Sequence, residues 1–166
     1  SDFFKYPDNK GLNLVFLHML GLLDTGKYVF ENLLQPDNTW RLRTEYFIGH
    51  NIWYSLRKIK GHFEMDNSDS IINLKYLTEI IEDGSKLFLS DFRNCMIHYN
   101  LVKNGIPCIK ENCYSEDKIF YGLVESYFDG MDYAKYFSKL RKYMTVIEEF
   151  LNEWFVIDYN KIKWDL

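Results

Sequence analysis

Residues 85–99 read Ser-Lys-Leu-Phe-Leu-Ser-Asp-Phe-Arg-Asn-Cys-Met-Ile-His-Tyr, and this stretch has the period of an amphipathic helix. At about 100° per residue, its apolar side chains form one stripe, which consists of Phe88, Leu89, Phe92, Met96 and Tyr99. The remaining arc is polar and holds Arg93, Asn94 and His98. Because a helix with one apolar stripe must bury that stripe, the stretch predicts a helix packed on a core, with these three polar side chains outside it.

Other segments of the chain also have helical periodicity. They are expected at about 10–34, 39–62, 70–82, 117–128 and 132–156. Asn38 or Thr39 is expected to cap the second of these segments and Asp132 the last. The apolar face of the second segment is expected to include Trp40, Phe47, Tyr54 and Ile59. With only 9 Gly and 3 Pro, the chain has few breaks, which suits long helices.

One short segment departs from this helical pattern. Residues 101–109 contain Asn104-Gly105, the dipeptide most typical of a two-residue hairpin turn, and Pro107 restricts the second strand to an edge. The fold class is therefore expected to be all-α. We expect an antiparallel bundle of four to six helices, with a hairpin-like insert after the motif helix. Residues 1–166 are expected to form a single domain, either a whole protein or one part of a longer chain.

Composition and charge restrict the function classes. The net charge is −4 and the pI is about 5.6, so the chain is not a general nucleic-acid coat, and any RNA contact must be local. The apolar run at 12–23 is too short to span a membrane, which needs roughly 20 residues. Cys95, Cys108 and Cys113 cannot all pair within the chain, which favours a reducing compartment. We therefore expect a cytoplasmic protein without a membrane segment.

Arg93, Asn94 and His98 carry groups that suit chemistry on phosphate. A guanidinium can hold a phosphate in a forked grip, and an imidazole can transfer a proton near neutral pH. Asn94 and His98 are four residues apart, so the amide could orient the imidazole. Arg93 and His98 lie about 140° apart around the helix, so they do not stack on each other directly. Ile97 is an apolar residue within this polar arc, which predicts that the face packs against a second copy of the chain around a two-fold axis.

The pattern Arg93-Asn94-x-x-x-His98 at the end of a helix, in an all-α chain, resembles the HEPN domains of prokaryotic toxin and phage-defence systems. The resemblance implies a dimeric helical bundle that acts as a metal-independent endoribonuclease without a cofactor. It assigns Arg93, Asn94 and His98 to the catalytic site in the dimer cleft. It also implies an RNA substrate, no DNA substrate, and an antitoxin or defence-system protein as a partner. The insert at 101–116 is not a general feature of that family.

The resemblance implies a specific reaction. His98 would act as general base on a ribose 2′-hydroxyl, which attacks the adjacent phosphate and leaves a 2′,3′-cyclic phosphate and a 5′-hydroxyl. Arg93 would stabilise charge on the phosphoryl oxygens, and Asn94 would orient His98 or a phosphate oxygen. His98 of the second subunit would protonate the leaving oxygen.

Two other interpretations of the motif region remain open. Cys95, His98, Cys108 and Cys113 form a Cys₃His set, the number of ligands that structural zinc prefers. The chain could also be an inactive HEPN-like module that binds other proteins through its aromatic side chains. The apolar face of the last helices is expected to be core. This face consists of Tyr127, Phe128, Tyr133, Tyr136, Phe137 and Tyr143. Lys139, Arg141 and Lys142 are expected to form a solvated helix face.

Overall fold

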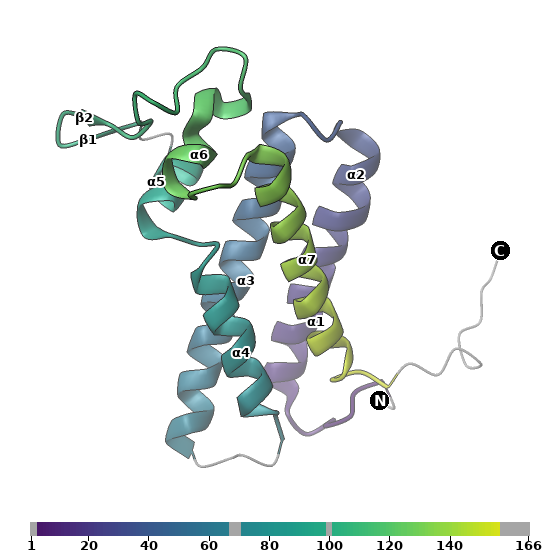
Figure 1. Ribbon diagram of the computed structural model, residues 1–166. Helices are drawn as coiled ribbons and strands as arrows, with labels where there is room; N and C mark the ends of the chain where they lie inside the picture. Colours follow the sequence, from purple (N-terminus) through teal and green to yellow (C-terminus); the bar gives the residue numbers. More distant parts are fainter. Residues whose placement is uncertain (1–2, 67–70, 99–100, 157–166) are drawn as a thin grey trace.

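The computed structural model describes residues 3–66, 71–98 and 101–156 and is a bundle of helices (Figure 1). The elements, in chain order, are α1 (Lys10–Asp24), a π-helical turn (Thr25–Val29), α2 (Phe30–Leu33), α3 (Thr39–Asp66), α4 (Leu74–Ser85), α5 (Ser90–His98), β1 (Val102–Lys103), β2 (Ile106–Pro107), a 3₁₀ turn (Ile119–Gly122), α6 (Leu123–Tyr127) and α7 (Tyr133–Asn152). The predicted all-α class is confirmed, with the two-stranded sheet β1–β2 as a small addition.

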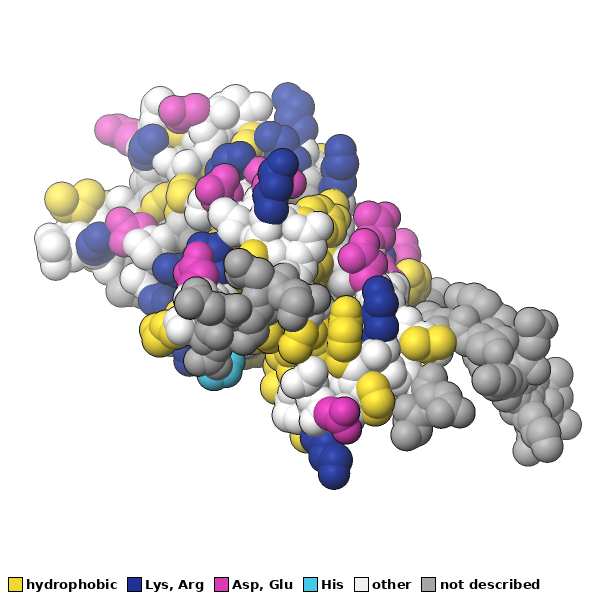
Figure 2. All heavy atoms as spheres, turned by 90° about the horizontal axis from the view of Figure 1, so that it is seen from below, with side chains coloured by type: hydrophobic (Ala, Val, Ile, Leu, Met, Phe, Trp, Pro, Cys, Tyr) yellow, Lys and Arg dark blue, Asp and Glu magenta, His cyan; other side chains and the backbone are white. Residues whose placement is uncertain are grey.

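Four helices run side by side along the length of the bundle. The chain rises through α1, descends through α3, rises through α4 and descends through α7, while α5, α6 and the hairpin lie at one end (Figure 1). At the other end, the backbones of Phe4 and Phe155 form an antiparallel β-bridge. The indole of Trp154 donates a hydrogen bond to Asn13 Oδ1 at 2.6 Å. Seen from that end, hydrophobic side chains are bordered by interspersed acidic and basic side chains (Figure 2). Within the part of the chain that the structure describes, no helix is long and apolar enough to cross a membrane.

Side-chain caps set several helix starts. Asn38 Oδ1 accepts a hydrogen bond from the Trp40 amide at the start of α3, and Asp132 Oδ1 accepts one from the Lys135 amide at the start of α7. Such caps satisfy amides that have no partner within the helix. Both expected starts are therefore confirmed. The predicted start of the third segment, Ser70, lies outside the described residues, and Asn73 caps α4 through the Tyr76 amide.

The motif helix is shorter than its period indicates. It begins at Ser90 rather than at Ser85, because α4 continues through Asp83-Gly84 to Ser85 and the chain then turns. Phe88 therefore lies outside α5, although its ring is buried as expected. The last residue of the predicted stripe, Tyr99, lies outside the described residues.

The expected buried face of α3 is wrong for its three aromatic residues, whereas Ile59 is half-buried against the core as expected. Trp40, Phe47 and Tyr54 are 60%, 48% and 47% exposed, whereas Leu42 and Tyr46 are fully buried. The helix packs on α1, α4, α5 and α7, and these contacts select a different stripe. The aromatic core near the C-terminus is confirmed, since Tyr133, Tyr136, Phe137 and Tyr143 are buried with Phe128, and Tyr127 is half-buried.

The hairpin is confirmed. β1 and β2 pair antiparallel through Val102–Pro107 and Lys103–Ile106, and Asn104 and Gly105 have φ angles of 53° and 78°. Positive φ at both central residues is the requirement of a type I′ turn. Lys103 Nζ also contacts Asp91 Oδ1 at 2.8 Å, so an ion pair connects the hairpin to the motif helix.

Charged side chains form a network inside the bundle. Arg41 Nε contacts the buried Glu45 at 3.1 Å, and Arg141 contacts Glu45 and Glu31 at 3.5 and 3.1 Å. The π-helical turn directs Lys27 into the bundle, where it forms an ion pair with Glu148.

The last helix is expected to have a solvated basic face. Lys139 and Lys142 are exposed, as expected. The expectation is wrong for Arg141, which is half-buried because its carboxylate partners come from α2 and α3.

Candidate functional site

The motif lies on α5, whose inner face is held by aromatic packing. Phe92 is fully buried, and its ring lies 5.4 Å from Tyr46, 5.0 Å from Phe128 and 5.3 Å from Tyr136, measured between ring centroids. Cys95 and Met96 are buried on the same side of the helix. This packing fixes the rotation of α5, so the motif residues occupy the rest of its surface.

The three motif residues differ in exposure. His98 is exposed at the last residue of α5, and Arg93 and Asn94 are half-buried. Arg93 Nη2 donates a hydrogen bond to Asn94 Oδ1 at 2.9 Å. Among the described residues, neither of these two side chains hydrogen-bonds to His98. Within one chain, the side chain of Asn94 therefore holds Arg93 and not His98. The imidazole of His98 is exposed to solvent.

A second helix, α3, contacts the main chain of the motif helix through Arg43. Arg43 Nη1 donates hydrogen bonds to the main-chain oxygens of Met96 and Cys95 at 2.7 and 3.4 Å, and its guanidinium lies 4.9 Å from the ring centroid of Phe120. The last carbonyls of a helix have no partner within it, and a cation there also interacts favourably with the helix dipole. Arg43 thus stabilises the turn of α5 that presents His98.

His50 is a second histidine near the motif. Its ring is 8% exposed and lies parallel to the rings of Tyr46 and Tyr54, at centroid distances of 6.2 and 6.4 Å. Burial lowers the pKa of His50, and the positive charge of Arg93 lowers it further, whereas a hydrogen bond with Asn51 opposes the shift. Both effects favour the neutral imidazole of His50 over its imidazolium form.

Unmatched polar atoms gather around Arg93. Arg93 Nε, His50 Nδ1 and Tyr46 Oη are all buried, and none of the three has a hydrogen-bond partner in the described structure. Burial raises the pKa of Tyr46, and the charge of Arg93 partly offsets that rise. Buried polar atoms usually have partners, so this cluster marks a polar spot below the motif. A sequence signal for part of this cluster existed, since Tyr46 and His50 are four residues apart and are therefore neighbours on one face of a helix.

The four residues of the alternative zinc set do not form a metal centre. The Cys95 thiol is buried and lies 3.6 Å from the hydroxyl of Tyr127, whereas His98 is exposed. Burial raises the pKa of Cys95 to about 11, which disfavours the thiolate that zinc requires. Among the described residues, no group of three or more His, Cys, Asp and Glu side chains could hold a metal ion.

Ile97 already has contacts within its own chain. It is half-buried and packs against the hydrophobic core, so part of its apolar surface is covered without a second subunit.

Comparisons of the chain with protein-family models, with curated proteins and with solved structures found no match. The resemblance to HEPN domains thus depends on the motif and on its position at the end of a helix in an all-α bundle.

Proposed function

We propose that the chain is a metal-independent endoribonuclease of the HEPN type. The observation that carries the proposal is the exposed His98 at the end of α5, with the half-buried Arg93 about one and a half turns earlier on the same helix. Neither side chain is enclosed in the hydrophobic interior, so both groups can meet a strand of RNA. The packing of Phe92 and the hydrogen bonds of Arg43 hold α5 in place, as preorganised catalytic groups require.

The reaction uses the adjacent 2′-hydroxyl of RNA as nucleophile. His98 takes the proton of that hydroxyl, whose oxygen then bonds to phosphorus, while the bond from phosphorus to the 5′-oxygen breaks. Arg93 stabilises the negative charge on the phosphoryl oxygens. The products are a 2′,3′-cyclic phosphate and a 5′-hydroxyl. DNA is not a substrate because it lacks the nucleophile.

A homodimer through the α5 face completes the proposed site. Arg93 and Asn94 bond to each other rather than to His98, so one chain does not assemble the three groups by itself. Two copies related by a two-fold axis would bring both His98 side chains to the dimer interface. One imidazole then acts as the base, and the other protonates the leaving 5′-oxygen. Sedimentation analysis of the wild-type protein measures whether this dimer forms.

The direct test is incubation of the purified protein with mixed RNAs in the presence of a chelator. We expect cleavage products with cyclic phosphate ends from the wild-type protein. His98→Ala should reduce the rate about 100- to 10,000-fold, and Arg93→Ala should also abolish most cleavage. His18→Ala, which removes an exposed histidine from α1, is the matched control and should retain full activity. Equal rates for His98→Ala and the wild-type protein would overturn the assignment.

The same experiment distinguishes the alternative of a non-catalytic interaction module. A stable dimer that cuts no RNA, yet forms a complex with another protein, would support that role. The antitoxin or defence-system partner implied by the resemblance would be sought in the same purification.

A further inference from the structure

The outward face of α3 carries three exposed aromatic side chains in a row. Trp40, Phe47 and Tyr54 are 60%, 48% and 47% exposed, and consecutive members are seven residues apart. Seven residues correspond to about 10.5 Å along a helix and to almost two full turns. The three rings therefore follow one another along a single side of the helix. Each of the three rings leaves about half or more of its surface open to solvent.

Cations share this side of α3. Arg43, Arg57 and Lys58 lie within about 80° of the centre of the same arc. The ammonium of Lys58 lies 4.6 Å from the ring centroid of Tyr54. We call the six residues Trp40, Arg43, Phe47, Tyr54, Arg57 and Lys58 the α3 stripe.

No carboxylate accompanies the α3 stripe along this part of its helix. Between residues 39 and 61 the sequence contains one acidic residue, Glu45, which is fully buried and contacts Arg41 and Arg141. By helical geometry it lies on the far side of α3, about 160° from the centre of the stripe. The stripe is therefore locally cationic and aromatic, although the whole chain carries a net charge of −4.

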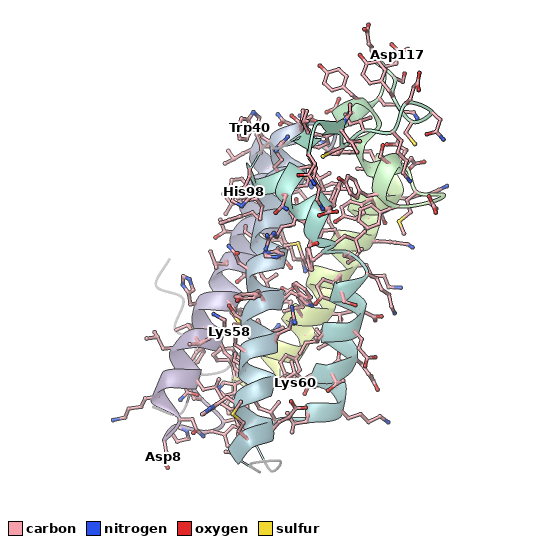
Figure 3. All side chains as sticks on the ribbon, turned by 90° about the vertical axis from the view of Figure 1, so that its left-hand side faces the viewer. Asp8, Trp40, Lys58, Lys60, His98 and Asp117 are labelled. Carbon is pink, nitrogen blue, oxygen red and sulfur yellow. The ribbon has the colours of Figure 1, made fainter. Side chains whose placement is uncertain are left out.

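The α3 stripe runs to the candidate site. Arg43, near one end of it, holds the last turn of α5, and Tyr54 is parallel to His50, the histidine near Arg93. Phe47 lies between these two points on the helix. Figure 3 places the labelled Trp40, His98 and Lys58 in succession along one side of the molecule. A strand that follows α3 would thus reach His98.

We infer that the α3 stripe binds single-stranded RNA, an inference that rests on the proposed function and locates its substrate. Aromatic side chains beside a cationic track are the combination that binds single strands, because bases stack on the rings and phosphates contact the cations. A second copy of the chain fits this surface less well. A two-fold contact would place the same patch on both subunits, so three cations would oppose three cations with no exposed carboxylate of residues 39–61 to offset them.

The test measures binding separately from cleavage. The His98→Ala protein is titrated into a fluorescently labelled, unstructured RNA oligonucleotide, and the anisotropy gives the affinity. Adding Phe47→Ala or Tyr54→Ala should weaken binding about 5- to 150-fold. Phe47→Leu keeps an apolar side chain but removes the aromatic face, so it should also weaken binding while keeping the fold. Leu14→Ala, at a 68% exposed apolar position of α1, is the control and should bind as before.

The charged half of the α3 stripe has its own test. The logarithm of the binding constant falls linearly with the logarithm of the salt concentration. Replacing Arg57 and Lys58 with Gln should make this slope less steep by about 0.7 for each phosphate that the two cations neutralise. The matched control replaces the exposed Lys139 and Lys142 of α7 with Gln, and its salt dependence should equal that of the parent protein.

Each result decides a different proposal. Unchanged affinity in Phe47→Ala, Phe47→Leu and Tyr54→Ala overturns the RNA surface, even when the wild-type protein cleaves RNA. Conversion of a dimer to a monomer by these changes also overturns it, since the stripe would then be a protein interface. RNA binding that depends on the α3 stripe, in a wild-type protein that cuts nothing, retains the surface and removes only the nuclease function.

Discussion

Arg43 on α3 donates a hydrogen bond to the main-chain oxygen of Met96, two residues before His98, at 2.7 Å. The two bonded residues are 53 positions apart in sequence, so the bond connects the motif helix to a distant helix of the bundle. Because a hydrogen bond from a charged donor contributes about 1.5–3 kcal/mol, we expect Arg43→Ala to lower the free energy of unfolding by about that amount. Urea unfolding followed by circular dichroism measures the change.

Removing this hydrogen bond should also reduce RNA cleavage, because the last turn of α5 would no longer hold His98 in place. Arg57→Ala is the control for stability, since Arg57 is exposed and its guanidinium stacks on Trp53 at 4.9 Å without supporting α5. Equal unfolding free energies for Arg43→Ala and the wild-type protein would show that α5 is held by its aromatic packing alone.

His50 makes the stability depend on pH. Folding lowers its pKa because burial and the charge of Arg93 both disfavour the imidazolium. The unfolded chain, in which the pKa has the ordinary value of 6.5, therefore binds a proton more readily than the folded chain. The stabilisation from neutral His50 is present above that value and is lost as the pH falls from about 6.5 toward the lowered pKa.

We expect His50→Phe to keep a flat ring between Tyr46 and Tyr54 while removing this proton linkage. Unfolding free energies at about pH 7.5 and about pH 5.5, on either side of the ordinary histidine pKa, should differ less in the variant than in the wild-type protein. An identical pH dependence in both proteins would mean that His50 takes up its proton equally well in the folded and unfolded chains.

Gly84 is a point of close packing between three helices. A Cβ atom at this position would collide with the Trp53 ring and the Tyr143 hydroxyl. Overpacking of a core costs about 1–3 kcal/mol. Gly84→Ala should therefore lower the free energy of unfolding by about 1–3 kcal/mol. Gly21→Ala on α1 is the matched control, since nothing lies within 4 Å of its Cβ position. Because Ala favours helix over Gly by about 0.5–1 kcal/mol, the control should be stabilised. Comparable stability of the two variants would contradict the packing at Gly84.

The proposed chemistry requires the 2′-hydroxyl next to the broken bond. An RNA oligonucleotide with a single deoxyribose at the mapped cleavage position should not be cut there, whereas the same change one nucleotide away should leave cleavage intact. Product analysis on a denaturing gel measures both. Cleavage at the deoxyribose would indicate attack by water and would exclude His98 from the role of base on the 2′-hydroxyl.

Several features of the fold follow from local sequence, and the structure agrees with them. Asp132 begins α7, Asn104-Gly105 makes the hairpin turn, and the C-terminal aromatics enter the core. Each depends on neighbours within a few residues, such as a cap, a turn dipeptide or a helical period. The motif also lies outside the stripe of Phe92 and Met96, as the period predicts, because that stripe is buried.

The sequence by itself determined that the chain is a helical bundle and that Arg93, Asn94 and His98 lie near the end of one helix. Tertiary structure alone decided where α5 begins and which face of α3 is buried, because both depend on the helices that pack against them. It also placed Arg43 and His50 beside the motif and left Trp40, Phe47 and Tyr54 exposed. Periodicity describes a helix surface, whereas burial depends on which surfaces of the folded chain meet.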